Sequence, residues 1–308
     1  MTEGTTIVRS TTADHERELE LSIVVLAWDN LPYTTDFVDT VRRHTDVPYE
    51  LIIIDNGSEP AAADYARSAA DIAVMNEVNR GFSPGMNQGL AVARGRYVAF
   101  CNNDTKMPAN WASKLIETAD ANPKAGIVVP ALTAAGTDRT VRTEPGDQIE
   151  VIPPFSGPPP AVIFLMPRPV VEGIGGWGEE YLVASGEDVD IGFKVWVNDL
   201  DIVYDQRVLV DHVGKVSASK LDDWQARWAE NRQIFLDKWM GDTVIPRIDA
   251  CDPATFARNR ATAASVAEWM AKYFKTRDKA RAAEAALLKA RAAAQAAAER
   301  SDPAAPVA

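Results

Sequence analysis

The chain has 308 residues, 46% of them hydrophobic and 25% charged, which is the composition of an ordinary globular protein with one large α/β domain or two smaller ones. Its 44 acidic residues outnumber 32 basic ones and give a net charge of −12, which argues against a general nucleic-acid binder, because phosphate contacts need clustered basic side chains. Two cysteines, Cys101 and Cys251, exclude a disulfide framework or a cysteine zinc cluster and are typical of a reducing cytoplasm.

Targeting segments are not expected. Residues 1–19 are polar and contain no apolar stretch of the kind that a secretory signal needs. No run of 18 or more apolar residues occurs, so we expect no transmembrane span. A cytoplasmic location follows as the simplest expectation, with peripheral contact at a membrane left open.

Strand and helix signals alternate through the first half of the chain. Apolar runs of strand length lie at 21–27, 50–56, 71–76, 96–104 and 126–132. The stretches between them have helical spacing or are rich in alanine, at 35–44, 60–70, 85–94 and 109–121. This order predicts an α/β fold with a mostly parallel sheet covered by helices on both faces. Ligands of such sheets bind outside the carboxyl ends of the strands, so the polar residues that end the strands are the candidates for a site.

The second half is less regular. Residues 134–160 are rich in Gly, Pro, Thr and acidic residues, and predict either a lid or acceptor-binding loop or a plain surface insertion. A helical pattern starts at Glu187, and the stretch 201–214 predicts a strand that ends near His212.

The tail differs in charge from the rest. The part from Ala254 onward carries ten basic and five acidic residues, a net +5, whereas the first 253 residues carry −17. Its apolar residues recur at helical spacing and predict one stripe that packs on the catalytic part or on a second subunit: Val266, Trp269, Met270, Tyr273 and Phe274. A docking helix with a solvated, Ala-rich extension is one interpretation. A basic arm for an oligomer partner, an anionic membrane or a polymer is the other.

Carboxylates and amides end two of the predicted strands. Asp55 precedes a Gly turn and could equally be a turn former or helix cap. Asp104 follows Asn102 and Asn103, and this set of oxygen-bearing side chains suits Mg²⁺ or Mn²⁺, although the signal is weak by itself.

Three further motifs are ambiguous when each is taken alone. The Gly/Asn-rich stretch 79–95 could approach a phosphate or could simply open a helix, and it is neither a Walker motif nor a dinucleotide fingerprint. Glu187, Asp188 and Asp190 are either ordinary first-turn acids or include a general base. His212 is the one histidine of three at a predicted strand end, although a lone histidine is often structural.

Taken together and in order, five stretches resemble the family 2 glycosyltransferases of the GT-A fold. They read LSIVVLAWDN, ELIIIDNGS, NRGFSPGMNQGLAVARGRYVAFCNNDT, GGWGEEYLVASGEDVDIGFKVW and VLVDHVG, and they span about residues 20–215. The resemblance implies a GT-A catalytic domain at 20–250, with a nucleotide-sugar half at about 20–133 and an acceptor half at about 134–250. The polar segment 1–19 precedes it, and a helical, basic extension at 251–308 follows it.

The resemblance also implies roles for individual residues. The nucleobase, ribose, diphosphate and sugar of the donor would contact Ala27, Trp28, Asp29, Asp55, Asn79, Gly81, Phe82, Asn87, Asn102 and Asn103. Asp104 and His212 would hold Mn²⁺ or Mg²⁺, with Asn102 standing where the family's metal motif often has its first Asp. The Glu187-Asp188 pair would supply the catalytic base, and we favour Asp188. Trp177 would form a platform for the acceptor, beside Gly176.

The implied reaction is inverting transfer of a sugar from a nucleotide donor of the UDP, GDP or dTDP type to a hydroxyl of a glycan, a lipid-linked molecule or a small molecule. A metal would offset the charge of the leaving diphosphate, and a carboxylate would remove the proton of the attacking hydroxyl. Two alternatives stay open. One is a sugar nucleotidyltransferase, although a basic Gly-rich loop near the first strand is missing. The other is a non-catalytic scaffold that acts through its basic tail, which could also mediate a homo-oligomer.

Overall fold

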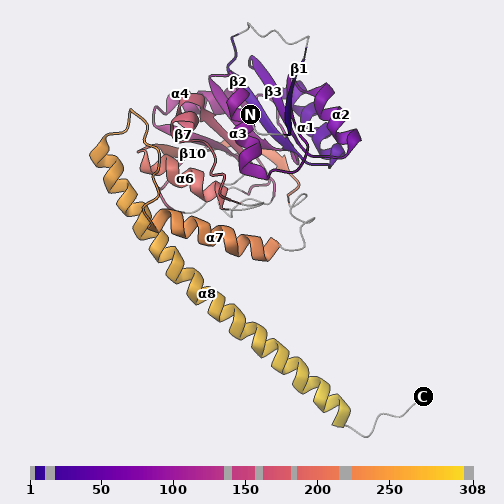
Figure 1. Ribbon diagram of the computed structural model, residues 1–308, viewed down its shortest axis with the longest axis vertical. Helices are drawn as coiled ribbons and strands as arrows, with labels where there is room; N and C mark the ends of the chain where they lie inside the picture. The colour runs from indigo at the N-terminus through magenta and orange to yellow at the C-terminus, as the bar shows by residue number, and fades with distance from the viewer. Residues whose placement is uncertain are drawn as a thin grey trace, which may run out of the picture.

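The computed structural model describes residues 4–10, 18–134, 141–156, 162–181, 186–214 and 224–301, with side chains from 226 to 279 in the last range. One ten-stranded sheet runs through the molecule (Figure 1). Nine strands follow one another across it in the order β1 (Thr5–Arg9), β4 (Ile72–Asn76), β3 (Tyr49–Asn56), β2 (Leu21–Ala27), β5 (Tyr97–Asn102), β9 (Ile163–Pro167), β7 (Ala125–Leu132), β10 (Asp201–His212) and β6 (Thr105–Lys106). The tenth, β8 (Ile149–Ile152), pairs with β10.

The predicted α/β architecture with a mostly parallel core of strands is confirmed. β4, β3, β2 and β5 are parallel neighbours, and so are β7 and β10. The sequence patterns did not predict four antiparallel strands. β1 comes from the polar N-terminal segment, and β6 is a two-residue strand directly after Asp104. β8 lies inside the stretch expected to be a loop, and β9 is a short apolar run close to prolines. Each is a short strand whose pairing depends on partners far away in the sequence.

Helices cover both faces of the sheet (Figure 1). One face carries α1 (Leu31–His44), α2 (Pro60–Ala69) and α4 (Trp111–Ala121), and its core includes Phe37, Ala66 and Trp111. The other face carries α3 (Phe82–Val92), α5 (Arg168–Gly173), α6 (Glu187–Val197), α7 (Trp224–Met240) and α8 (Pro253–Ser301). α3 lies very close to the sheet because Gly85 and Gly89 face Leu26 and Val24, where a Cβ atom would come within 2.4 and 2.3 Å of a side-chain carbon.

The C-terminal helix only partly follows the expectation from the sequence. Val266, Met270 and Phe274 pack against the core, but Trp269 and Tyr273 are 62% and 50% exposed, and their rings stack on each other with centroids 5.5 Å apart. These two side chains therefore do not pack on the rest of the same chain, and their packing on a second subunit stays a prediction. Beyond this part, α8 projects away from the body (Figure 1).

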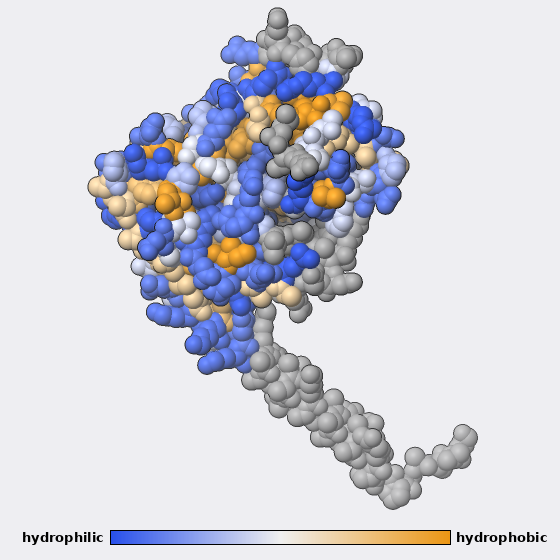
Figure 2. All heavy atoms as spheres, viewed as in Figure 1, coloured by the Kyte–Doolittle hydropathy of each residue, from blue (hydrophilic) through white to orange (hydrophobic). Residues whose placement is uncertain are grey.

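The surface seen in Figure 2 is mainly hydrophilic, with separate apolar patches rather than one large one. Among the helices that the structure describes, none is both long enough and apolar enough to cross a bilayer. Cys101 and Cys251 are free and buried.

Candidate active site

Asp55 and the end of β2 lie side by side at the carboxyl edge of the sheet. Ala27 is paired with Asp55 in the β2–β3 register. Asp29 follows in a left-handed turn (φ 52°), its N–H donates to Ser58 Oγ at 2.8 Å, and its Oδ1 accepts the N–H of Glu59 at 2.9 Å. These contacts join the turn after β2 to the start of α2, so the end of β2 and Asp55 are held in fixed positions.

The Asp55 carboxyl is buried at the edge of an open cavity. It is 2% exposed, and in the described part of the chain its Oδ1 has no hydrogen-bond partner. Burial raises the pKa of Asp55, and hydrogen bonds from Ser58 oppose that rise. The cavity beside it has a volume of about 340 Å³. An unpaired buried carboxylate oxygen is costly unless a donor arrives, so this atom is suited to receive an N–H group of a ligand.

A chain of side-chain amides orders the turn that opens α3. Asn56 donates from Nδ2 to Asn79 Oδ1 at 2.8 Å, and its Oδ1 accepts the N–H of Arg80 at 3.0 Å. Asn79 Oδ1 also accepts the N–H of Gly81 at 2.9 Å, and Gly81 has a φ of 92° that a larger residue would rarely adopt. The predicted donor residues Asn79 and Gly81 therefore belong to one preorganised turn at the strand ends.

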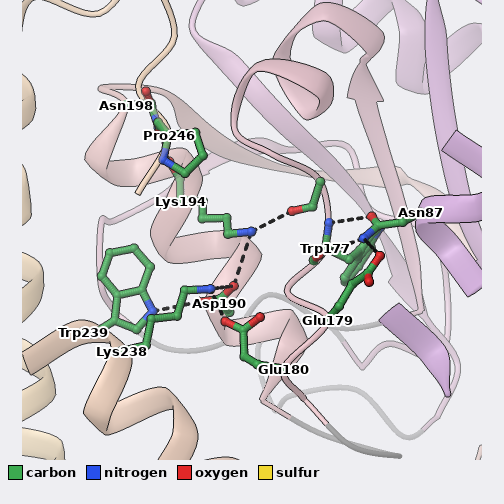
Figure 3. A network of polar contacts seen from close by, with 11 residues as sticks. Asn87, Trp177, Glu179, Glu180, Asp190, Lys194, Asn198, Lys238, Trp239 and Pro246 are labelled. Carbon is green, nitrogen blue, oxygen red and sulfur yellow. Dashed lines mark hydrogen bonds and ion pairs between the residues drawn. The ribbon is translucent and has the colours of Figure 1, made fainter. Parts of the chain in front are cut away.

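Asn87, an expected donor residue on α3, is hydrogen-bonded to the loop that carries Gly176 and Trp177, the expected acceptor residues (Figure 3). Its Oδ1 accepts the N–H of Trp177 at 2.9 Å, and its Nδ2 donates to Trp177 O and to Glu179 Oε1, both at 2.9 Å. Gly176 lies so close that a Cβ atom there would come within 2.6 Å of Asn87 Oδ1. In this structure Asn87 thus holds the loop backbone in place.

Trp177 does not form the platform that the sequence suggested. Its side chain is 1% exposed, and its ring makes edge contacts with Phe82, Phe100 and Phe164 at centroid distances of 5.2 to 5.4 Å. The indole fits between helix α3 and the sheet because burying so large an apolar ring stabilises the fold. Trp177 is therefore a core residue, and Phe82 packs against it while staying half-buried at the start of α3.

Asp104 and His212, far apart in sequence, meet where β6 pairs with β10. His212 is opposite Thr105 in the register, and His212 Nε2 lies 3.4 Å from Asp104 Oδ1. The other ring nitrogen, Nδ1, lies 3.1 Å from the carbonyl oxygen of Ala134. A carbonyl can only accept, so Nδ1 carries a proton and the neutral ring presents the lone pair of Nε2 to the Asp104 side.

This pair fits a divalent cation by its chemistry. Neighbouring ligands of an octahedral ion bound at about 2.1 Å are about 3 Å apart, close to the 3.4 Å observed here. Burial lowers the pKa of His212, but the Asp104 carboxylate and the Ala134 carbonyl outweigh it and raise the pKa above its usual value. Among the described residues no group of three or more His, Cys, Asp or Glu side chains could hold a metal, so further ligands would have to come from amides, water or substrate.

The two asparagines before Asp104 differ in their surroundings. Asn103 is 7% exposed, and its Nδ2 donates to Thr34 Oγ1 at 3.0 Å. That contact ties the turn to α1, and the expected contact of Asn103 with the donor stays a prediction. Asn102 is half-buried, and its carbonyl oxygen accepts the Thr105 hydroxyl at 2.7 Å, which fixes the turn just before the metal pair.

Glu187 and Asp188 begin helix α6. The helix ends at Val197, and β10 begins after a three-residue turn at Asp201. The Asp188 carboxyl accepts the N–H of Gly186 at 3.2 Å. Desolvation raises the pKa of Asp188 above its ordinary value, while backbone hydrogen bonds act in the other direction.

A buried ionic network holds this helix, and the sequence did not reveal it (Figure 3). Asp190 is fully buried, and its oxygens accept from Trp239 Nε1 and Lys238 Nζ, each at 2.9 Å. Lys194 lies 3.6 Å from the same carboxylate and donates to Gly176 O at 2.8 Å. Lys238 also pairs with Glu180. The i,i+4 spacing of Asp190 and Lys194 was visible in the sequence, but no local pattern indicated the partners from α7.

A second hollow lies over this network. It measures about 370 Å³ and is lined in part by Glu179, Glu180, Lys194, Lys238 and Pro246. Lys238 pairs with Glu180 and with Asp190, and Lys194 also lies beside Asp190. Glu179 accepts a hydrogen bond from Asn87, so the hollow is polar without an excess of positive charge.

Part of the chain is similar to known proteins. Residues 22–155 match the model of glycosyl transferase family 2. The uncharacterized glycosyltransferase EpsJ of Bacillus subtilis is 31% identical over 106 residues, which are 33% of this chain and 31% of that protein. The poly-beta-1,6-N-acetyl-D-glucosamine synthase of Staphylococcus epidermidis is 23% identical over 247 residues, or 74% of this chain and 58% of that protein. The first of these matches spans about a third of the relative's own length.

Solved structures share the fold at low sequence identity. The mannosyltransferase PcManGT from Pyrobaculum calidifontis, in complex with GDP-Man and Mn²⁺, superposes with a TM-score of 0.58 at 18% identity, covering 91% of this chain and 81% of that one. TarS 1–349 of S. aureus gives a TM-score of 0.54 at 14% identity over 79% of this chain and 70% of that one. The expected GT-A architecture is therefore confirmed.

Proposed function

Because residues 22–155 match the model of glycosyl transferase family 2, we propose that the chain transfers a sugar from a nucleoside-diphosphate donor to an acceptor hydroxyl with inversion at the anomeric carbon. The observation that carries this proposal is the Asp104–His212 pair at the carboxyl edge of the sheet. It brings together one carboxylate and one imidazole nitrogen, both buried, from segments that are 108 positions apart in sequence.

The donor would occupy the half of the edge formed by β2, β3 and the turn before α3. The free oxygen of Asp55 would accept a ring N–H of the nucleobase, a group that uracil, thymine and guanine carry. The turn at Asn79–Gly81 would place backbone N–H groups beside the diphosphate. Complexes of structural neighbours with GDP-Man or with UDP are in line with such a donor.

The metal would be held by Asp104 and His212, with the donor's own oxygens completing its shell. When bound there, Mn²⁺ or Mg²⁺ offsets the negative charge that develops on the leaving diphosphate. Ala134 keeps the proton of His212 on Nδ1, and Gly214 donates its N–H to the second oxygen of Asp104 at 3.2 Å. These contacts orient both ligands before any donor arrives.

Asp188 would remove the proton of the acceptor hydroxyl as it attacks the anomeric carbon. Its raised pKa makes it a stronger base than an ordinary aspartate. For this role Asp188, on the first turn of α6, would have to face the anomeric carbon from the side opposite the leaving diphosphate. Attack from that side would invert the configuration of the sugar.

The proposal is tested by nucleotide-sugar hydrolysis and binding with the full chain. UDP- and GDP-sugars are titrated calorimetrically with and without Mn²⁺, and release of the nucleoside diphosphate is followed. We expect Mn²⁺-dependent binding that is lost in Asp104→Ala and in His212→Ala, with unchanged circular dichroism. Lys272→Ala, on the exposed face of α8, is the matched control. If Asp104→Ala and His212→Ala bind donor like the unmodified protein, the metal site lies elsewhere.

A further inference from the structure

Strand β1 lies outside the part of the chain that matches the family. The family match begins at residue 22, whereas β1 covers Thr5–Arg9. It pairs antiparallel with β4 in an unbroken register from Thr5–Asn76 to Arg9–Ile72, and so adds one strand to the nucleotide-half edge of the sheet (Figure 1). The strand therefore lies outside the matched segment, and it borders the proposed donor site.

The register sets Thr6 in line with Asp55. Asp55 pairs with Met75 across β3 and β4, and Met75 pairs with Thr6 across β4 and β1. Residues paired directly across neighbouring strands point to the same face of the sheet. Asp55 and Thr6 therefore face the same side, two strand spacings or about 10 Å apart.

These residues enclose the cavity that contains the free Asp55 oxygen. Met75 lies between Asp55 and Thr6, Val8 follows on the same face of β1, and Ala63 and Arg67 of α2 close the opposite wall. The chemistry of the walls is mixed, with apolar surface from Met75, Val8 and Ala63 and polar groups at the two ends. A flat ring that carries an N–H on one edge and polar atoms on another matches this arrangement, and a nucleobase has that shape.

Hydrogen bonds connect β1 to the rest of the proposed donor site. Thr5 Oγ1 donates to Asn76 Oδ1 at 2.9 Å, and Asn76 exchanges hydrogen bonds of 2.8 and 2.9 Å with Gln88 of α3. Asn76 also donates to Asn56 Oδ1 at 3.2 Å, and Asn56 orders the turn at Asn79. The strand is thus joined by amide contacts to the turn proposed to lie beside the diphosphate.

We propose that β1 forms the outer wall of the nucleobase site and that Thr6 contacts the edge of the base that lies away from Asp55. This inference rests on the proposed function, because it assumes a nucleotide donor. The Thr6 hydroxyl can donate to a base carbonyl or accept from an exocyclic amine. The strand would thereby contribute to the choice between a pyrimidine and a guanine nucleotide.

The test uses Thr6→Trp, which fills the cavity, and Arg9→Trp as the matched control. Arg9 lies on the same strand, is exposed and points to the opposite face, so the same substitution leaves the cavity open. UDP and GDP are titrated with Mn²⁺ by calorimetry, and inorganic pyrophosphate with Mn²⁺ serves as a probe without a base. Melting curves confirm that both variants fold.

We expect Thr6→Trp to weaken the preferred nucleotide by at least tenfold, with pyrophosphate binding and the Arg9→Trp variant within twofold of the unmodified protein. Thr6→Val should change the ratio of the UDP and GDP affinities. Unchanged nucleotide affinity in Thr6→Trp, or an equal loss for pyrophosphate, overturns the role of β1. Failure of the unmodified protein to bind either nucleotide would instead count against the proposed function.

Discussion

The two halves of the proposed site are held by different forces. On the donor side, neutral amides fix the turns, as in the chain Thr5–Asn76–Gln88. On the acceptor side, a fully buried carboxylate, Asp190, is held by Lys238 and Trp239. Neutral hydrogen bonds contribute modestly to stability, whereas a buried charge that loses its partner is strongly destabilising. The acceptor half therefore depends on a few ionic contacts, and the donor half on many weaker ones.

The largest effect should come from breaking the ionic contact. Lys238→Ala leaves the Asp190 carboxylate buried with one close ammonium fewer, and we expect a loss of about 3–5 kcal/mol in the free energy of unfolding. Urea unfolding measures it, and the exposed Lys272→Ala should stay within about 0.5 kcal/mol of the unmodified protein. Equal stability of the two variants would mean that the network contributes little.

Removal of the proposed base should affect rate rather than folding. We expect Asp188→Asn to lower sugar transfer by about 100-fold, the lower end for loss of a general base, with donor affinity nearly unchanged. Steady-state kinetics and donor titration separate the two effects. Glu187→Gln is the matched neighbour, and an inactive Glu187→Gln beside an active Asp188→Asn would move the role to Glu187.

The loss of activity at acid pH is a second test of the role of Asp188. A general base must be ionised, so activity falls as the pH drops through its pKa. Because burial raises the pKa of Asp188, this fall should occur at higher pH than for an ordinary aspartate, whose pKa is about 3.9. A profile of kcat/KM against pH, with stability checked at each pH, would show it. A profile that stays flat down to about pH 4 would contradict the assignment.

Removing one hydrogen-bonding side chain on the donor side should lower the free energy of unfolding by less than Lys238→Ala does. Gln88→Ala removes the amide that exchanges two hydrogen bonds with Asn76, and we expect a loss of about 1 kcal/mol in unfolding free energy. The same urea experiment as for Lys238→Ala gives the comparison. A loss as large as that of Lys238→Ala would erase the contrast between the halves.

The smallest effect is expected at the end of α8. Truncation after Arg277 removes an Ala-rich stretch that projects from the body, so donor hydrolysis and melting temperature should stay unchanged (Figure 1). Truncation before Ala264 would remove Val266, Met270 and Phe274 from the core and should lower stability or solubility. Light scattering and melting curves on both proteins test this. A shorter truncation as stable as the full chain would mean that these contacts are dispensable.

Much of the donor half could be predicted from the sequence alone. β2, β3, β4 and β7 lie within one residue of the predicted runs, because buried parallel strands are continuous apolar segments whose ends are marked by polar residues. The motifs around Asp55, Asn79 and Asp104 are local, so their order along the chain was enough to suggest the family. The family pattern also predicted that His212 lies near Asp104, and the pairing of β6 with β10 brings the two residues together.

Tertiary structure decided what depends on distant partners. Sequence patterns report local periodicity. The pairing of β1 with β4, the packing of Trp177 against Phe82 and Phe100, and the ion pair of Asp190 with Lys238 each join residues 48 to 95 positions apart. A lysine on a helix gives the same local signal whether it lies in solvent, as Lys272 does, or beside a buried carboxylate, as Lys238 does. Only the packing of the helices distinguishes them, because burial is a property of the whole fold.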